Sequence, residues 1–298
     1  MSAIRPVRPI LPVRKAVFPV AGLGTRLLPA TKTMPKEMLT VVDRPLIQYA
    51  VDEARDAGIE QLIFVTGRGK SSLVDYFDLG FELEATMEKA GKSRAALDGS
   101  RTTPGELISV RQQQPLGLGH AVWCARHIVG DEPFAVILPD DLMVGTLSEG
   151  GALRQMVEAY NRVGGNIVCA AEVATDKTAS YGIVTPGRSE GNLTEVLGLV
   201  EKPKPADAPS RLGIIGRYIL QPEAMDILGA KEAGAGGEIQ LTDAMAKLIG
   251  MQPFHAVKVD AVRHDCGDKA GFVLANLAIA MDDPVLGPRV AEFLASRA

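Results

Sequence analysis

Near its start the chain combines two glycines with two cationic side chains, a combination that suits a polyphosphate ligand. Gly22 and Gly24 follow a short apolar run, residues 16–20, and Arg26 and Lys36 come after them. Glycine lets the backbone turn sharply and approach a ligand without a Cβ in the way. The two cations could then balance phosphate charge, so this stretch predicts a phosphate-binding loop.

Two better-known glycine loops do not fit this stretch. A Walker A loop requires Gly-x-x-x-x-Gly-Lys followed by Ser or Thr, and the chain has no such run. A dinucleotide-binding fingerprint needs a small residue in third place, where this chain has Leu27. A lone Gly-x-Gly would indicate an ordinary strand-to-helix turn, but Arg26, Pro35 and Lys36 at these spacings favour a ligand-binding loop.

Three aspartates follow predicted strands later in the chain. Asp140 and Asp141 come directly after the apolar run 134–138, where a buried carboxylate is costly unless it faces solvent or a cation. Because Mg²⁺ takes one or two carboxylates alongside substrate phosphates, we interpret Asp140 as a metal ligand, with an N-cap as the alternative. Asp141 is the better candidate for the cap of a following helix. Asp265 follows a late strand, 254–259, and on its own would favour a turn or cap over a metal site.

The elements around these residues alternate between strands and helices. Residues 16–20 and 61–66 are predicted strands, and residues 45–58 carry apolar side chains at helical spacing. Such a βαβ unit is typical of a parallel sheet with right-handed crossovers. Ligands bind beyond the carboxyl ends of parallel strands, where Gly22 and Gly24 lie.

The rest of the chain continues the alternation. Further strands are predicted over residues 106–111, 134–138, 166–173, 193–200, 212–220 and 254–259. Helical patterns cover residues 81–97 and 121–129, begin again near residues 222 and 239, and end the chain over 268–281 and from 288.

Two further segments could contact a ligand. Residues 112–120, QQQPLGLGH, form a second glycine loop that leads into a helix, whose N–H groups suit an anion or a base edge. For Gln112, a solvated loop amide is as good an explanation as a ligand role. Glu201 and Lys202 end a predicted strand just before a proline. Such a pair is normally solvated and contributes at most about 1 kcal/mol to stability. Its position at a possible ligand-binding edge of the sheet favours a role in ligand binding.

Composition narrows the class of protein. The 298 residues are 46% hydrophobic and 23% charged, which is typical of a globular protein with ample core. A net charge of −4 argues against a nucleic-acid partner, and the lack of any long apolar run argues against a membrane. The three cysteines have no C-x-x-C spacing, so we expect a cytoplasmic protein with its cysteines packed as small core residues.

The domain organisation is predicted to be simple. Residues 1–13 contain several prolines and arginines and lack the apolar core of a signal peptide, so we expect a flexible arm. The chain has no clear interdomain linker. Residues 14–298 are therefore predicted to form a single domain that includes the C-terminal helices.

These motifs together resemble those of the sugar-1-phosphate nucleotidylyltransferases. The opening signature is AGLGTR at residues 21–26 with PKEM at 35–38. The family's later motifs follow in order: LGHA at 118–121, LPD at 138–140, YG at 181–182, VEKP at 200–203, EIQLTD at 238–243 and HDCG at 264–267. The resemblance spans nearly the whole chain. It implies an α/β fold, a Rossmann-like mixed, mostly parallel sheet flanked by helices, known as the nucleotide-diphospho-sugar transferase fold.

The resemblance also implies roles for matched residues. The uracil and ribose end would be held by Ala21, Gly22, Gln112 and Gly117, with Gln113 as the alternative to Gln112 and with Gly24 and Thr25 in the same nucleotide-binding loop. Arg26 would hold the triphosphate and Lys36 the phosphates being joined, as the catalytic pair. Asp140 and Asp265 would bind Mg²⁺ as the cofactor. Gly182, Glu201 and Lys202 would bind the sugar phosphate, with Glu201 accepting hydrogen bonds from glucose hydroxyls.

The implied reaction is uridylyl transfer from UTP to glucose 1-phosphate, which yields UDP-glucose and pyrophosphate by in-line attack at the α-phosphorus. A homodimer or homotetramer is implied by the family alone. A thymidylyltransferase would typically have glycine in place of Ala21 and Gly-Asp-Asn at residues 139–141. A non-catalytic nucleotide-sugar sensor could dispense with the cations and carboxylates present here. A metal-dependent glycosyltransferase would usually carry Asp-x-Asp, which Asp140-Asp141-Leu142 does not supply.

Overall fold

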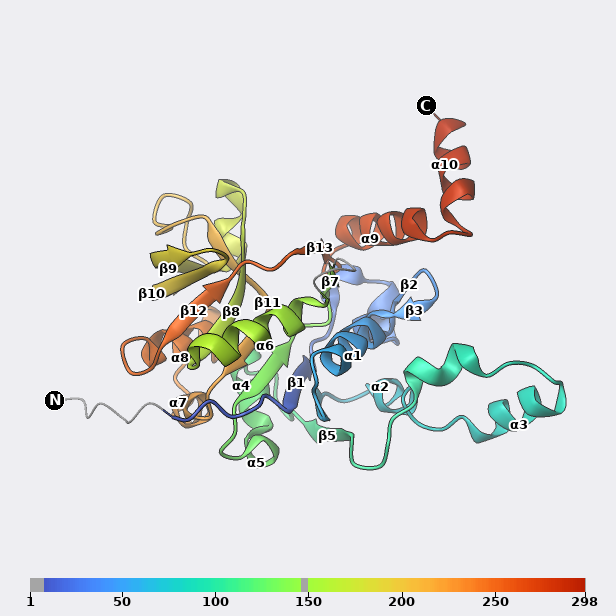
Figure 1. Ribbon diagram of the computed structural model, residues 1–298, viewed down its shortest axis with the longest axis horizontal. Coiled ribbons are helices and arrows are strands. Elements are labelled where there is room, and N and C mark those ends of the chain that lie inside the picture. Colours follow the sequence, from blue (N-terminus) through green and yellow to red (C-terminus); the bar gives the residue numbers. More distant parts are fainter. Residues whose placement is uncertain (1–7, 146–149, 298) are drawn as a thin grey trace.

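A nine-stranded sheet with helices on both faces forms the body of the computed structural model, which describes residues 8–145 and 150–297 (Figure 1). In spatial order the strands are β5 (Leu107–Arg111), β4 (Gln61–Thr66), β1 (Lys15–Val20), β6 (Phe134–Ile137), β11 (Leu212–Leu220), β8 (Asn166–Glu172), β12 (Phe254–Val257), β10 (Leu193–Glu201) and β9 (Gly182–Glu190). The predicted α/β class is confirmed, and the predicted strands 61–66 and 212–220 match to the residue.

The two halves of the sheet differ in strand direction. β5, β4, β1 and β6 are parallel neighbours, so their carboxyl ends lie at one edge. β11 runs antiparallel to both β6 and β8, and β9 and β10 form an antiparallel pair. The sheet is mixed, as predicted, but its antiparallel part is larger than a mostly parallel sheet would have.

Helices cover both faces of this sheet (Figure 1). The helices are α1 (Leu46–Asp56), α2 (Ser72–Asp75), α3 (Phe81–Lys89), α4 (Leu118–Cys124), α5 (Arg126–Val129), α6 (Ala152–Val163), α7 (Glu223–Gly229), α8 (Leu241–Leu248), α9 (Lys269–Asp282) and α10 (Gly287–Ala295). Of these, α3, α9 and α10 project beyond the sheet (Figure 1). Because successive strand side chains point to opposite faces, Phe18 of β1 packs in the cluster formed with α1 and α6. Its neighbour Val17 packs in the cluster formed with α4, α7 and α8. The strands that lead to the candidate site are thus buried on both sides.

A two-stranded ribbon, β7 (Asp141–Gly145) with β13 (Ala261–Asp265), lies outside the main sheet. Sequence patterns predict neither strand. The antiparallel register places Asp265 opposite Asp141. This ribbon therefore brings the late HDCG motif beside the end of β6, although more than 100 residues separate them. A second ribbon joins β2 (Thr40–Val41) and β3 (Arg44–Pro45).

The last two helices lie outside this body. α9 and α10, both predicted, lead away from the sheet, as the red ribbon in Figure 1 shows. Arg8 is bonded to Glu223 at 2.6 Å and to Asp131 at 2.8 Å. Residues 1–7 of the predicted arm lie outside the described residues.

The structure bears on the predicted burial of the cysteines and on the predicted lack of a membrane span. Cys169 and Cys266 are buried, as predicted, whereas Cys124 is half-buried. Among the described helices, none alone is long and apolar enough to cross a membrane; the bent pair α9 and α10 passes that test together, by length and composition only.

Candidate active site

The opening glycine loop folds back onto the segment that carries Lys36. Gly24 has a φ of +67°, and a Cβ there would lie 3.2 Å from the Cβ of Lys36 and 3.2 Å from Cγ2 of Thr31. The Thr31 hydroxyl donates a hydrogen bond to the Gly24 carbonyl at 2.7 Å. Both the left-handed conformation and the close approach favour glycine. The chain then continues in short 3-10 turns, the third of which, Lys36–Met38, carries the lysine.

Lys36 and Asp140 form a close ion pair at the end of β6. The Lys36 Nζ lies 2.5 Å from Oδ2 of Asp140. Burial favours a higher pKa for Asp140, but the charge and hydrogen bond of Lys36 outweigh it and hold the pKa below its usual value. Burial likewise opposes the charge on Lys36, yet Asp140 and Glu37 raise the pKa of the lysine. Both side chains therefore stay charged near neutral pH.

Gly267, just after β13, marks the point where the predicted cation and carboxylates meet. A Cβ on Gly267 would lie 3.0 Å from Oδ1 of Asp265, 3.1 Å from Nη2 of Arg26 and 3.3 Å from Oδ2 of Asp140. These three atoms therefore lie close to one position. The structure therefore brings Arg26, Lys36, Asp140 and Asp265 together, although they come from separate parts of the sequence.

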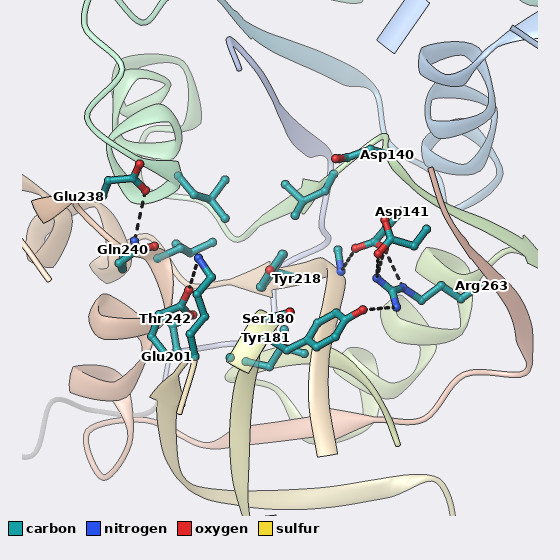
Figure 2. A pocket seen from close by; sticks show the side chains of 18 of the residues that line it. Asp140, Asp141, Ser180, Tyr181, Glu201, Tyr218, Glu238, Gln240, Thr242 and Arg263 are labelled. Carbon is teal, nitrogen blue, oxygen red and sulfur yellow. Dashed lines mark hydrogen bonds and ion pairs between the residues drawn. The ribbon is translucent and has the colours of Figure 1, made fainter. Parts of the chain in front are cut away.

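A cleft of about 270 Å³ extends from this point across the sheet edge (Figure 2). Six of the predicted site residues line it: Arg26, Asp140, Gly182, Glu201, Lys202 and Asp265. The residues predicted to face the phosphates and those predicted to bind the sugar phosphate thus line one concave surface. Small-molecule sites usually have this form.

The far end of the cleft is built from β9, β10 and the start of α8. Gly182 pairs with Glu201 across the two strands, and a Cβ on Gly182 would lie 3.0 Å from Oγ1 of Thr242 and 3.3 Å from Oε2 of Glu201. Lys202 bonds Glu201 at 3.2 Å and has a φ of +46°. A left-handed non-glycine residue is uncommon and is typical of constrained functional positions.

The predicted nucleotide-binding residues follow neighbouring strands. A Cβ on Gly67, which follows β4, would lie 3.1 Å from the carbonyl oxygen of Ala21, which follows β1. Gln112 follows β5 and donates its backbone N–H to Thr66 at 2.9 Å. Because β5, β4 and β1 are parallel neighbours, these ends share one edge. Gly22, Thr25 and the alternative base reader Gln113 are exposed there.

The prediction that Asp141 caps a helix is wrong. Asp141 begins β7, so no helix follows it. Its Oδ2 accepts a hydrogen bond from the backbone N–H of Gly216 at 3.0 Å, and its Oδ1 accepts one from Nε of Arg263 at 2.7 Å. Burial raises the pKa of Asp141, against the charge of Arg263. The half-buried aspartate anchors β13 and is not a helix cap.

Sequence reasoning missed several residues that line the cleft. Arg263 pairs with Asp141, bonds the Tyr181 hydroxyl at 3.0 Å and lies 3.6 Å from Oδ2 of Asp265, so it connects the two ends of the cleft. Thr242 and Gln240 also line it. Tyr181, Gln240 and Thr242 lie in the motifs YG and EIQLTD. The sequence pattern indicated a structural role for these motifs, so these three residues were given no contact with a ligand.

A buried ion pair involves Glu37, the residue next to Lys36. Lys70, which follows β4, bonds Oε2 of Glu37 at 2.8 Å, and both side chains are buried. Burial raises the pKa of Glu37 and lowers the pKa of Lys70, while the mutual attraction of the two charges opposes both shifts. The pair holds the 3-10 turn that carries Lys36 against the segment between β4 and α2.

Two aspartates near the Gly267 position suit one kind of metal site. Within residues 8–145 and 150–297, no cluster of three or more His, Cys, Asp or Glu side chains could hold a metal ion. Asp140 and Asp265 nevertheless direct one oxygen each toward the Gly267 position. Mg²⁺ commonly binds through one or two carboxylates with substrate phosphates and water. The two aspartates therefore fit a magnesium ion that arrives with a phosphorylated substrate.

Known proteins resemble this chain over most of its length. A family model described as nucleotidyl transferase matches residues 15–281. A UTP–glucose-1-phosphate uridylyltransferase of Komagataeibacter xylinus is 54% identical over 262 residues, covering 87% of this chain and 91% of the relative.

Solved structures agree with this match. A UTP-bound UGPase from Acinetobacter baumannii superposes with a TM-score of 0.87 at 42% identity, covering 95% of this chain and 99% of that one. A UDP-glucose pyrophosphorylase complexed with UDP-glucose has a TM-score of 0.82 at 40% identity, with coverage of 91% and 100%.

Proposed function

The chain belongs to the nucleotidyl transferase family, and from this premise we propose that it transfers the uridylyl group of UTP to glucose 1-phosphate. The products are UDP-glucose and pyrophosphate. The observation that carries the proposal is the convergence of Arg26, Asp140 and Asp265 on one position at the end of the cleft. The uridylyltransferase relative and the UTP-bound neighbour support the choice of substrates.

Electrostatics determines how two polyanions can react in this cleft. At about 4 Å and an effective dielectric of about 20, each pair of like unit charges costs roughly 4 kcal/mol. Arg26 would contact the triphosphate, and Lys36 the phosphates that are joined. With both cations in place, a phosphate oxygen of glucose 1-phosphate attacks the α-phosphorus in line, and pyrophosphate leaves. Positioning and charge neutralisation account for such chemistry, so no side-chain nucleophile is required.

We assign Asp140 and Asp265 as the residues that would hold Mg²⁺. When bound, the ion neutralises phosphate charge and stabilises the leaving group. In the free protein the Lys36 Nζ is paired with Oδ2 of Asp140 at 2.5 Å. Lys36 thus keeps the carboxylate charge balanced in the free protein.

The two ends of the cleft would divide the substrates between them. Gly182, Glu201 and Lys202 would bind glucose 1-phosphate, with Glu201 accepting hydrogen bonds from sugar hydroxyls and Gly182 leaving room for the ring. The nucleotide would lie over the loop formed by Ala21, Gly22, Gly24 and Thr25, with Gln112 and Gly117 at the base. Of the two candidate amides we favour Gln112, because its side chain is held in place by hydrogen bonds.

We also propose a homodimer or homotetramer in the cytoplasm, built from a single domain over residues 14–298. The support for assembly is the apolar surface of α9 and α10, where Val273 is 63%, Leu274 60% and Phe293 56% exposed. Apolar patches of this kind commonly mark interfaces between proteins. The unpaired cysteines agree with a reducing compartment.

The decisive experiment combines the purified protein with UTP, glucose 1-phosphate and MgCl₂ and identifies the products by mass spectrometry. We expect UDP-glucose and pyrophosphate in equal amounts, and no turnover after EDTA treatment until Mg²⁺ is restored. A strong preference for dTTP would indicate a thymidylyltransferase. Binding of UDP-glucose without turnover would indicate a sensor, and sugar transfer to an acceptor would indicate a glycosyltransferase.

A further inference from the structure

Two acceptors fix the side-chain amide of Gln112. Its Nε2 lies 3.0 Å from the carbonyl oxygen of Gly117 and 3.1 Å from Nδ1 of His120. A carbonyl oxygen can only accept, so the nitrogen of the amide must face Gly117. Rotating the amide by half a turn would set two oxygens against each other. The orientation of the Gln112 amide is therefore determined by its neighbours.

The carbonyl of Gly117 is itself held in place. Gly117 has a φ of +107°, and a Cβ there would lie 2.8 Å from both the carbonyl oxygen of Ile239 and Cβ of Glu238. The backbone of the segment before α8 thus packs directly against Gly117. Neither partner of the amide is free to follow a rotation of Gln112.

His120 can accept the second hydrogen bond because its ring is neutral. The side chain lies on α4, is 8% exposed, and stacks on Trp123 with ring centroids 5.8 Å apart. Burial lowers the pKa of His120, and the nearby cations Lys231 and Arg126 lower it further. A neutral imidazole has one acceptor nitrogen and one donor nitrogen. With Nδ1 as the acceptor, the proton sits on Nε2.

We propose that His120 is a positioning residue for base selection: it holds Gln112 so that only the amide oxygen faces the nucleobase. The inference rests on the proposed function, because it requires Gln112 to meet the base. In the described parts of the chain, no donor is bonded to Oε1 of Gln112. That oxygen remains available as an acceptor.

The fixed oxygen distinguishes the two common pyrimidines. Uracil presents an N3–H donor between two carbonyl groups, whereas cytosine presents an acceptor at N3 and an amine at C4. An amide oxygen accepts from uracil N3–H but repels cytosine N3. A freely rotating amide could offer either its oxygen or its nitrogen and would serve both bases. A site that leaves a buried polar group unpaired rejects the wrong ligand strongly.

The test compares UTP with CTP in three variants. His120→Phe keeps an aromatic ring on Trp123 and removes the acceptor, while His120→Asn places an amide oxygen near the position of Nδ1. Gln114→Ala changes an exposed amide in the same loop and serves as the control. KM and kcat are measured for each nucleotide with saturating glucose 1-phosphate, and UTP and CTP binding is measured by calorimetry without the sugar.

We expect His120→Phe to raise the KM for UTP about tenfold with a much smaller change in kcat, the effect of one lost orienting hydrogen bond. The ratio of kcat/KM for UTP to that for CTP should fall by about the same factor. His120→Asn should restore most of this ratio, and Gln114→Ala should leave it unchanged. A double variant with Gln112→Leu should lose no more discrimination than Gln112→Leu alone, because His120 acts through Gln112.

Several results would overturn the inference. An unchanged UTP-to-CTP ratio in folded His120→Phe would do so, as would an equal loss of kcat for both nucleotides, which a purely structural role would produce. Additive losses in the double variant would also count against it. If His120→Phe does not fold, His120→Asn and Gln112→Leu still decide the question. If the wild-type protein makes no UDP-glucose, the proposed function fails, yet calorimetry still reports whether His120 controls the choice of base.

Discussion

At the scale of single residues, the candidate site depends on charges that balance one another before any substrate arrives. Asp140 bonds Lys36 at 2.5 Å, and Lys36 is followed by the buried pair of Glu37 with Lys70. Arg26 reaches the same region from the exposed loop. Preorganised charges of this kind stabilise a transition state without first rearranging. Changes at these positions should therefore affect turnover more than folding.

Removal of the Lys36 amine should reduce turnover. We expect Lys36→Ala to lower kcat by about 10² to 10³, the scale for loss of one preorganised electrostatic contact. Steady-state kinetics with UTP and glucose 1-phosphate measures this effect. Lys32→Ala, which removes an exposed lysine from the neighbouring turn, is the control and should retain wild-type kcat. A folded Lys36→Ala protein with a normal rate would contradict the assigned role.

A methyl group at Gly267 should disturb the charged side chains that lie close to it. The added Cβ would lie 3.0 to 3.3 Å from Asp265, Arg26 and Asp140, so these side chains must shift. A misplacement of about 1 Å can cost about 10² in rate. These contacts require shifts of only a few tenths of an ångström, so we expect Gly267→Ala to lower kcat by about tenfold. The melting temperature should change little.

Gly80→Ala is the matched control for Gly267→Ala, because its nearest neighbour would be 3.7 Å away. Both proteins are assayed for kcat and by thermal denaturation. Full activity in Gly267→Ala would mean that this position lies outside the reacting centre.

At the scale of elements, a buried ion pair holds the strands and helices that carry the site. Arg217 of β11 bonds Glu53 of α1 at 2.6 Å, and the two side chains are 1% and 6% exposed. Arg217 also donates to the carbonyl of Leu138 at 2.9 Å, and Glu53 accepts from the backbone of Leu153 at 3.0 Å. One pair thus joins β11, α1, the start of α6 and the turn that leads to Asp140.

Removal of one partner should leave an uncompensated charge inside the protein. We expect Arg217→Leu to lower the free energy of unfolding by about 3 to 5 kcal/mol, the usual cost of breaking a buried pair from one side. Urea denaturation measures this loss.

The exposed ion pair of Arg154 with Asp56, at 3.7 Å, supplies the control for Arg217→Leu. Arg154→Ala should change stability by no more than about 1 kcal/mol. Equal effects of the two substitutions would show that the buried pair has no special role.

At the scale of the whole molecule, α9 and α10 extend from the body (Figure 1). Several of their apolar side chains are exposed. α9 joins the body through a small cluster in which Ala275 packs with Cys266 and Leu142. The first turn of α9 is capped by Asp268, whose carboxylate accepts from Gly271 N–H at 2.8 Å. The segment from Cys266 through α9 thus connects the candidate site to the proposed interface between subunits.

Charged substitutions on this surface should weaken assembly. We expect Leu274→Asp combined with Phe293→Asp to shift the protein toward the monomer, because burying an unpaired carboxylate is costly. Light scattering coupled to size-exclusion chromatography measures the mass. Leu197→Asp is the control, since Leu197 is 57% exposed on β10, away from these helices. A monomeric wild-type protein, or an unchanged mass in the double variant, would contradict the proposed interface.

The sequence by itself determined the local elements and the residues able to handle phosphate. Strands 61–66 and 212–220 were predictable to the residue because short segments rich in apolar residues are a local property of the sequence that a buried strand requires. The glycine loop and the motif residues were also readable, since each depends on a few neighbouring positions. The family resemblance covers these same short segments.

Only the tertiary structure decided which of these residues meet. Asp141 could be read as a helix cap because its partners, Gly216 and Arg263, are distant in sequence, and Arg263 carries no signal that it would face Asp141. The ribbon of β7 with β13 sets Asp265 opposite Asp141, and the contact of Gly117 and His120 with Gln112 fixes an amide that spacing left open. Such pairings depend on strand register and on the packing of loops across the sheet edge, which no local pattern encodes.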